Sequence, residues 1–134
     1  MCRDESRPAQ KYACLVDAEN TQPSKMSAIF DELDSYGQLD VRKLYGDFSR
    51  TKRRPWRDVS KKLAFQPHTQ FAPVSGKSSS DMAMDAISIL HHDRLNVDGF
   101  ALVSSSDFIP LASKLRQSGK VVIGFGQRKP QNLL

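Results

Sequence analysis

Four aspartates stand where the chain is expected to leave a strand or to enter a helix. Asp17 ends an apolar run that starts at Tyr12, and Asp107 follows a second apolar run and three serines. Asp81 follows a loop of small residues, and Asp85 shares its helical face one turn later. Carboxylates gathered at one place repel each other, and a hard divalent cation is the usual counter-charge. The pattern therefore predicts a divalent cation among these side chains.

Each aspartate also has a simpler interpretation. Asp81 and Asp107 are good helix N-cap residues, and Asp17 could close a loop or cap the helix that follows. The metal hypothesis therefore depends on the set of aspartates. Asn20 adds a neutral oxygen or an amide donor beside Asp17, whereas Glu19 is one residue out of phase and is expected to face away.

The scaffold that must position these residues alternates between strands and helices. Apolar runs predict strands at 12–16, 41–45, 100–103 and 121–123, with a further edge strand at 70–74. Helical spacing predicts helices at 23–36, from Trp56 to before Pro67, at 81–92 and at 108–118. This alternation predicts an α/β fold, a parallel sheet flanked by helices, whose ligands bind at the carboxyl ends of the strands.

Composition sets the class of protein. The 134 residues suit one domain, which we expect at 11–134 after a polar N-terminal arm at 1–10, and 39% hydrophobic residues exclude a disordered chain. Two cysteines provide no disulfide framework and no Cys/His metal spacing. With no signal-peptide pattern and no membrane-spanning run, the expected location is the cytoplasm. The net charge of +5 favours nucleic acid as a partner, although it would also serve solubility.

Five motifs together resemble the NYN domain, the LabA-like branch of the PIN-like nuclease superfamily. They run in order from about Tyr12 to about Lys129 and are Asp17-Ala18-Glu19-Asn20, Tyr45-Gly46-Asp47-Phe48, Gly76-Lys77-Ser78-Ser79-Ser80-Asp81, Val103-Ser104-Ser105-Ser106-Asp107-Phe108 and Gly124-Phe125-Gly126. The resemblance implies a three-layer α/β/α domain, a Mg²⁺ or Mn²⁺ site, and RNA cleavage in at least some members. By position it makes Asp17, Asp81 and Asp107 the acids and Asn20 a companion of Asp17. It places Ser104 and Ser105 at the pocket.

The chain departs from the family pattern at three places. The stretch Ser104-Ser105-Ser106-Asp107-Phe108 has one aspartate and is one residue short. Asp85 follows Asp81 about two residues sooner than usual. The helix and strand that usually follow the Gly-Phe-Gly motif are expected to be absent, and the sheet edge this would expose favours a homodimer.

These observations predict metal-dependent hydrolysis of RNA. The metal would lie between Asp17, Asp81 and Asp107, and Asp85 or Asn20 would orient the water. Single-stranded RNA would bind to basic residues and to one aromatic platform, Trp56. The basic residues are Arg50, Lys52, Arg53, Arg54, Arg57, Lys77, Arg128 and Lys129. The alternative for this basic run is a solvated face with Trp56 in the core.

Three other functions remain open from the sequence. The first is a catalytically impaired RNA-binding or regulatory module, which the single aspartate before Phe108 favours. The second is a phosphatase-like or phosphotransfer enzyme on a doubly wound sheet, and the third is a protein-interaction domain with a vestigial pocket.

Overall fold

The computed structural model describes residues 10–46, 54–68, 78–92, 94–105, 107–126 and 131–132. In chain order its elements are strand β1 (Lys11–Asp17), the 3₁₀ turns η1 (Ala18–Asn20) and η2 (Pro23–Lys25), α1 (Met26–Asp34), β2 (Gln38–Tyr45), α2 (Arg54–Lys62), β3 (Gln66–His68), α3 (Ser78–Leu90), β4 (Gly99–Val103), α4 (Ile109–Gln117), β5 (Val121–Phe125) and β6 (Gln131–Asn132).

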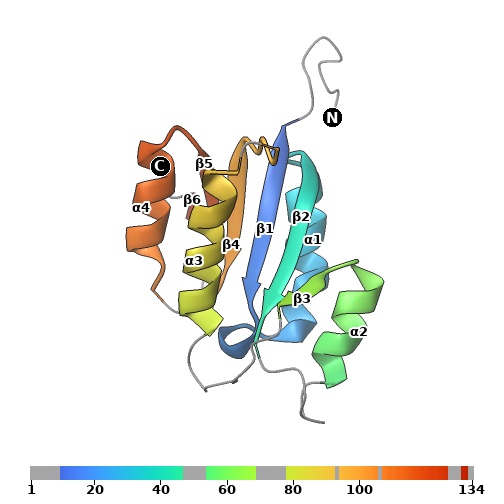
Figure 1. The fold of residues 1–134 in the computed structure, drawn as a ribbon. Helices are drawn as coiled ribbons and strands as arrows, with labels where there is room; N and C mark the ends of the chain where they lie inside the picture. Colours follow the sequence, from blue (N-terminus) through green and yellow to red (C-terminus); the bar gives the residue numbers. More distant parts are fainter. Residues whose placement is uncertain are drawn as a thin grey trace.

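The strands form one sheet in the order β3-β2-β1-β4-β5-β6 (Figure 1). β1 pairs in parallel with both β2 and β4, and among the described strands only β6 runs antiparallel to its neighbour. The chain therefore extends the sheet from β1 in one direction as far as β3 and then resumes on the other side of β1. The order reverses between β1 and β4, which makes the carboxyl ends of these two strands the expected ligand site.

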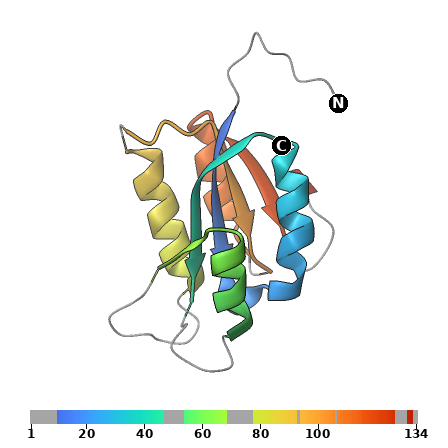
Figure 2. The same ribbon diagram turned by 90° about the vertical axis from the view of Figure 1, so that its right-hand side faces the viewer.

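Helices cover both faces of the sheet (Figures 1 and 2). Successive strand side chains point to opposite faces, and the even-numbered residues of β1 at 12–16 pack with α1 and α2. Ala13 and Leu15 pack with α3 and α4 on the other face. This three-layer α/β/α sandwich confirms the predicted fold class.

Three elements differ from the sequence prediction. α2 ends at Lys62, and Ala64 then adopts a left-handed backbone (φ 58°) before β3. The strand predicted at 70–74 lies outside the described residues, while β3 at Gln66–His68 was not predicted because Pro67 argues against a strand. Pro67 is tolerated because β3 is the last strand on its side of the described sheet. The two-residue β6 was not predicted either.

None of the described helices has the length and apolar character needed to cross a membrane.

Burial of Cys14 in β1 gives the protein a pH-dependent stability. Burial raises the pKa of its thiol from 9.0 to about 12, and the nearby Arg42 guanidinium opposes this more weakly. The unfolded chain therefore loses this proton near pH 9 while the folded chain keeps it. We expect the free energy of unfolding to fall above pH 9 by roughly 1.4 kcal/mol per pH unit for this group. Urea unfolding from pH 8 to 11 measures the slope. Cys14→Ala should make it shallower, and an unchanged slope would contradict this assignment.

Candidate functional site

Asp17, the last residue of β1, lies at the reversal point of the sheet with its side chain fully buried. Strand alternation puts it on the α3 face, with Leu15. Its Oδ2 accepts hydrogen bonds from Asn20 Nδ2 and from Ser104 Oγ, each at 2.9 Å. The predicted pairing of Asn20 with Asp17 is thus confirmed, and Ser104 joins it from the end of β4.

Backbone and hydroxyl contacts tie together the chain segments after β1, β4 and β5. The amide of Ser105 donates to the carbonyl of Asn20 at 2.8 Å, and Ser105 Oγ donates to the same oxygen at 2.7 Å. The amide of Ser104 donates to the carbonyl of Phe125 at 2.9 Å. These bonds hold the Asp17 carboxylate in one position before any ligand arrives.

Asp81 lies in the first turn of α3, since the helix already begins at Ser78. The interpretation of Asp81 as the N-cap is therefore wrong. Its Oδ2 is buried and has no hydrogen-bond partner within the described part of the chain. Leaving a buried carboxylate oxygen unsatisfied is costly, so this atom marks a place where a donor or a cation is expected.

Asp85, one turn later, is held by two side chains of β2. The hydroxyl of Tyr45 donates to Asp85 Oδ2, and Lys43 Nζ forms an ion pair with the same oxygen at 3.0 Å. Burial raises the pKa of Tyr45, and the hydrogen bond and charge of Asp85 and the charge of Asp81 add to this effect. Tyr45 is also the register partner of Asp17, so both side chains lie on the face of the sheet that α3 covers.

The Asp85 contacts predict a measurable stability difference. Asp85→Ala should lower the free energy of unfolding by about 1–3 kcal/mol, because it removes the acceptor of the Tyr45 hydroxyl. Replacing both partners, in Tyr45→Phe/Asp85→Ala, should cost less than the sum of the single changes. Urea unfolding of the four proteins measures this coupling, with the exposed Asp34→Ala as control. Strictly additive costs would show that the pair does not interact.

Asp107 is exposed and lies before α4, where its Oδ1 accepts a hydrogen bond from the amide of Ile109 at 3.0 Å. The interpretation of Asp107 as the N-cap is wrong, because Phe108 occupies that position, and the Asp107 carboxylate instead holds the amide of the first helical residue. Asp107 also borders a cavity of about 250 Å³ between α3 and α4, which Met82 and Phe108 help to line. Among the described residues, no group of three or more His, Cys, Asp or Glu side chains is arranged to hold a metal ion.

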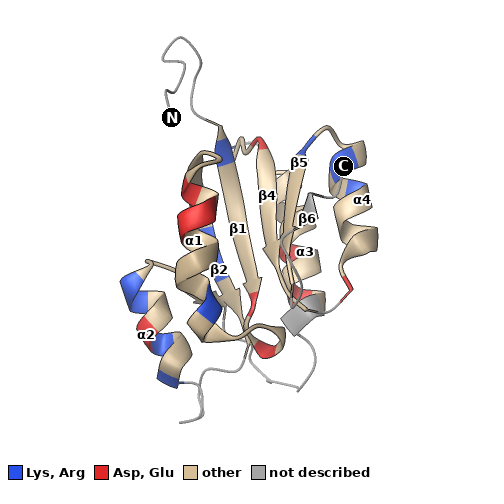
Figure 3. Ribbon diagram, turned by 180° about the vertical axis from the view of Figure 1, so that it is seen from behind, with Lys and Arg blue, Asp and Glu red and all other residues tan. Residues whose placement is uncertain are grey.

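The basic residues are only partly within the described chain. Arg50, Lys52, Arg53, Lys77, Arg128 and Lys129 lie outside it. α2 carries four exposed cations, which Figure 3 shows as blue bands: Arg54, Arg57, Lys61 and Lys62. Trp56 is 2% exposed and belongs to the core under α1 and α2. Its interpretation as an aromatic platform is therefore wrong, whereas the core alternative is confirmed.

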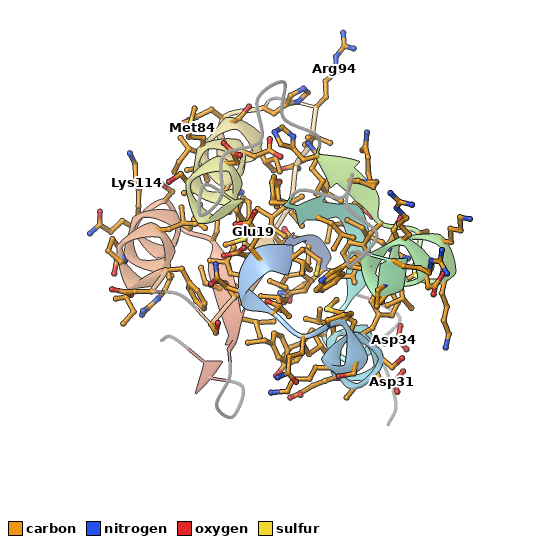
Figure 4. All side chains as sticks on the ribbon, turned by 90° about the horizontal axis from the view of Figure 1, so that it is seen from below. Glu19, Asp31, Asp34, Met84, Arg94 and Lys114 are labelled. Atoms are coloured by element: carbon orange, nitrogen blue, oxygen red, sulfur yellow. The ribbon has the colours of Figure 1, made fainter. Side chains whose placement is uncertain are left out.

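Two functional features escaped the sequence prediction. Lys43 and Tyr45 hold Asp85, and the signal that could have found them is their shared face two residues apart in a strand. A second pocket lies at the ends of β1, β4 and β5, and Glu19 helps to line it. Seen along the strands, Glu19 lies near the centre of the rim, on the turn after β1 (Figure 4). The expectation that Glu19 faces away from Asp17 stays a prediction.

A parallel sheet between two helical layers, with acids at the point where strand order reverses, defines a PIN-like α/β domain. The sequence model of the NYN domain matches residues 11–134, nearly the whole chain, so the protein belongs to the NYN domain family. Domains of this family are nuclease-like, generally use divalent metal ions and typically bind RNA. No curated protein and no solved structure matched the chain.

Proposed function

We propose that the chain is a metal-dependent endoribonuclease of the LabA-like branch of the NYN family. One observation carries this proposal most directly: the fully buried carboxylate of Asp17 ends β1, and Asp81, with a buried oxygen that has no partner among the described residues, lies in the first turn of α3 over the same face of the sheet.

Asp17 and Asp81 would hold Mg²⁺ or Mn²⁺. Both supply carboxylate oxygen, and one or two carboxylates, completed by water and phosphate oxygens, commonly suffice for Mg²⁺. Asp107 is the third proposed ligand by its place in the family motif, and it would have to approach the other two acids when the ion binds, because no three described acids are arranged around one ion here. When bound, the ion would stabilise charge on the phosphate and make a bound water more acidic.

The other residues of the rim act on these carboxylates. Asn20 and Ser104 position Asp17 through hydrogen bonds. Ser104 is 1% exposed, so it would act on RNA indirectly, by holding the Asp17 carboxylate. Asp85, oriented by Lys43 and Tyr45, is our candidate for orienting the attacking water. Asn20 donates to Asp17, which favours a positioning role for it over a role in contacting water.

Single-stranded RNA would run from this rim toward α2. Arg54 and Arg57 lie exposed on α2, and Ser105 is exposed at the rim. We assign Arg53, Lys77 and Arg128 to the same track by their places in the sequence. Contacts of this kind neutralise phosphates, so affinity should fall steeply as salt rises.

The test is cleavage of a labelled single-stranded RNA with Mg²⁺ or Mn²⁺ and with chelator. We expect cleavage only with metal, and a rate about a hundredfold lower in Asp81→Asn, because one ligand loses its charge. Asp34→Asn, an exposed change on α1, should cleave normally. Binding of Mn²⁺ followed by electron paramagnetic resonance checks the site without any cleavage.

The rival function is a catalytically impaired RNA-binding module. It is favoured by the single aspartate before Phe108, whose carboxylate already bonds the amide of Ile109. This rival predicts salt-sensitive RNA binding that does not depend on metal, and no cleavage with metal or with chelator.

Two further expectations complete the proposal: a cytoplasmic location and a homodimer. Sedimentation at high micromolar concentration tests the second, and a clean monomer would contradict it.

A further inference from the structure

A pocket of about 230 Å³ opens at the carboxyl ends of β1, β4 and β5, on the α1 side of the sheet. Its apolar wall consists of Ile29, Val103 and Phe125, which belong to or pack against the core beneath α1. Asp17 lies on the opposite face, and Asn20 joins the two places. Its side chain bonds Asp17, and the residue also lines the pocket.

The rest of the lining is polar and carries both donors and acceptors. Glu19 provides a carboxylate, Gln22 an amide and Ser105 a hydroxyl. Lys25 is the single cation among the described lining residues, and Glu19 offsets its charge. A pocket with one cation and one carboxylate does not favour an isolated phosphate. An apolar wall with hydrogen-bonding groups around it suits a flat ring that has N–H and C=O groups on its edge.

Size narrows the ligand further. Pockets for drug-sized molecules span roughly 300–1,000 Å³, and this one is smaller, so it suits one ring system. A carboxylate recognises an amino group on a base, as it does with N4 of cytosine. Glu19 therefore favours adenine, guanine or cytosine over uracil.

We propose that this pocket is a nucleobase subsite, which holds one unpaired base while the adjoining phosphate lies at Asp17 and Asp81. The placement of this phosphate next to the acids rests on the proposed nuclease function, whereas binding of the base in the pocket does not. The Ser105 bonds to Asn20 tie the pocket wall to the acidic rim, so a base held in the pocket would fix the register of the RNA strand.

The test is a nuclear magnetic resonance titration of the whole chain in chelator, with AMP, GMP, CMP, UMP and ribose 5-phosphate as probes. We expect amide shifts at Gln22, Ser105 and Gly126 with the amino-bearing nucleotides, and binding at least about threefold weaker for UMP. Ribose 5-phosphate, which has no base, should leave these amides unmoved.

Variants of the pocket complete the test. Gln22→Ala should weaken AMP binding about threefold to tenfold by removing one edge contact, and Ile29→Trp should abolish it by filling the space. Gln117→Ala, an exposed change at the end of α4, is the matched control. The same spectra report whether each variant is folded.

The outcomes separate the subsite from the nuclease. Unmoved pocket amides at millimolar nucleotide, or equal shifts with ribose 5-phosphate, would overturn the subsite even if RNA is cleaved. Equal affinity for all four nucleotides would overturn the amino-group preference. Base binding that is lost in Gln22→Ala supports the subsite even if the chain cleaves no RNA.

Discussion

Asp17→Asn is expected to lower metal-dependent RNA cleavage by about a thousandfold while leaving the fold intact. The change removes one negative charge and keeps the shape of the side chain. A metal's stabilisation of transition-state charge amounts to several kcal/mol, and each 1.36 kcal/mol is a factor of ten in rate. The amide oxygen of asparagine can still accept the hydrogen bonds from Asn20 and Ser104.

Two measurements separate catalysis from stability in this experiment. Single-turnover cleavage gives the rate, and urea unfolding should show a change within about 1 kcal/mol, because both donors keep an acceptor. Asp31→Asn, on the outer side of α1 (Figure 4), is the matched control and should alter neither quantity. A loss of less than tenfold, with metal dependence unchanged, would place the metal elsewhere.

Trp56→Ala is expected to destabilise the domain by about 3–5 kcal/mol. The side chain is buried beneath α1 and α2, and truncation removes a large apolar surface and leaves a cavity that neighbouring groups fill only in part. Trp56 is the single tryptophan of the chain, so unfolding of this variant must be followed by circular dichroism.

Trp56→Phe tests the consequence of this core position for RNA binding. Phenylalanine keeps an aromatic ring but fills less space, so we expect reduced stability with RNA affinity within twofold of the parent protein. Fluorescence anisotropy with a labelled oligonucleotide measures the affinity under conditions where both proteins are folded. A tenfold loss of affinity in the folded variant would show that the tryptophan contacts RNA. Base stacking of about 1–3 kcal/mol would then account for the loss.

The layers and the central strands follow from local pattern. Runs such as Tyr12–Val16 are apolar on both sides, as strands buried between two helical layers must be, and the helices show one apolar face. β3 and β6 escaped prediction because they are short and lack such a run. β3 exists because β2 offers it a pairing edge, which is information from outside the segment.

The acids at the strand ends and the pairing of Asp17 with Asn20 could be predicted from the sequence. Both features are local, since a strand end is visible in one segment and Asn20 follows Asp17 by three residues. The contacts between distant segments became visible only in the folded chain: Ser104 bonds Asp17, Lys43 and Tyr45 bond Asp85, and Phe125 lines the same pocket as Glu19. The core position of Trp56 also appears only there, because basic residues surround it in sequence. Contacts between distant segments depend on strand order and on the packing of helices. Neither can be predicted from the residue spacing within a single segment.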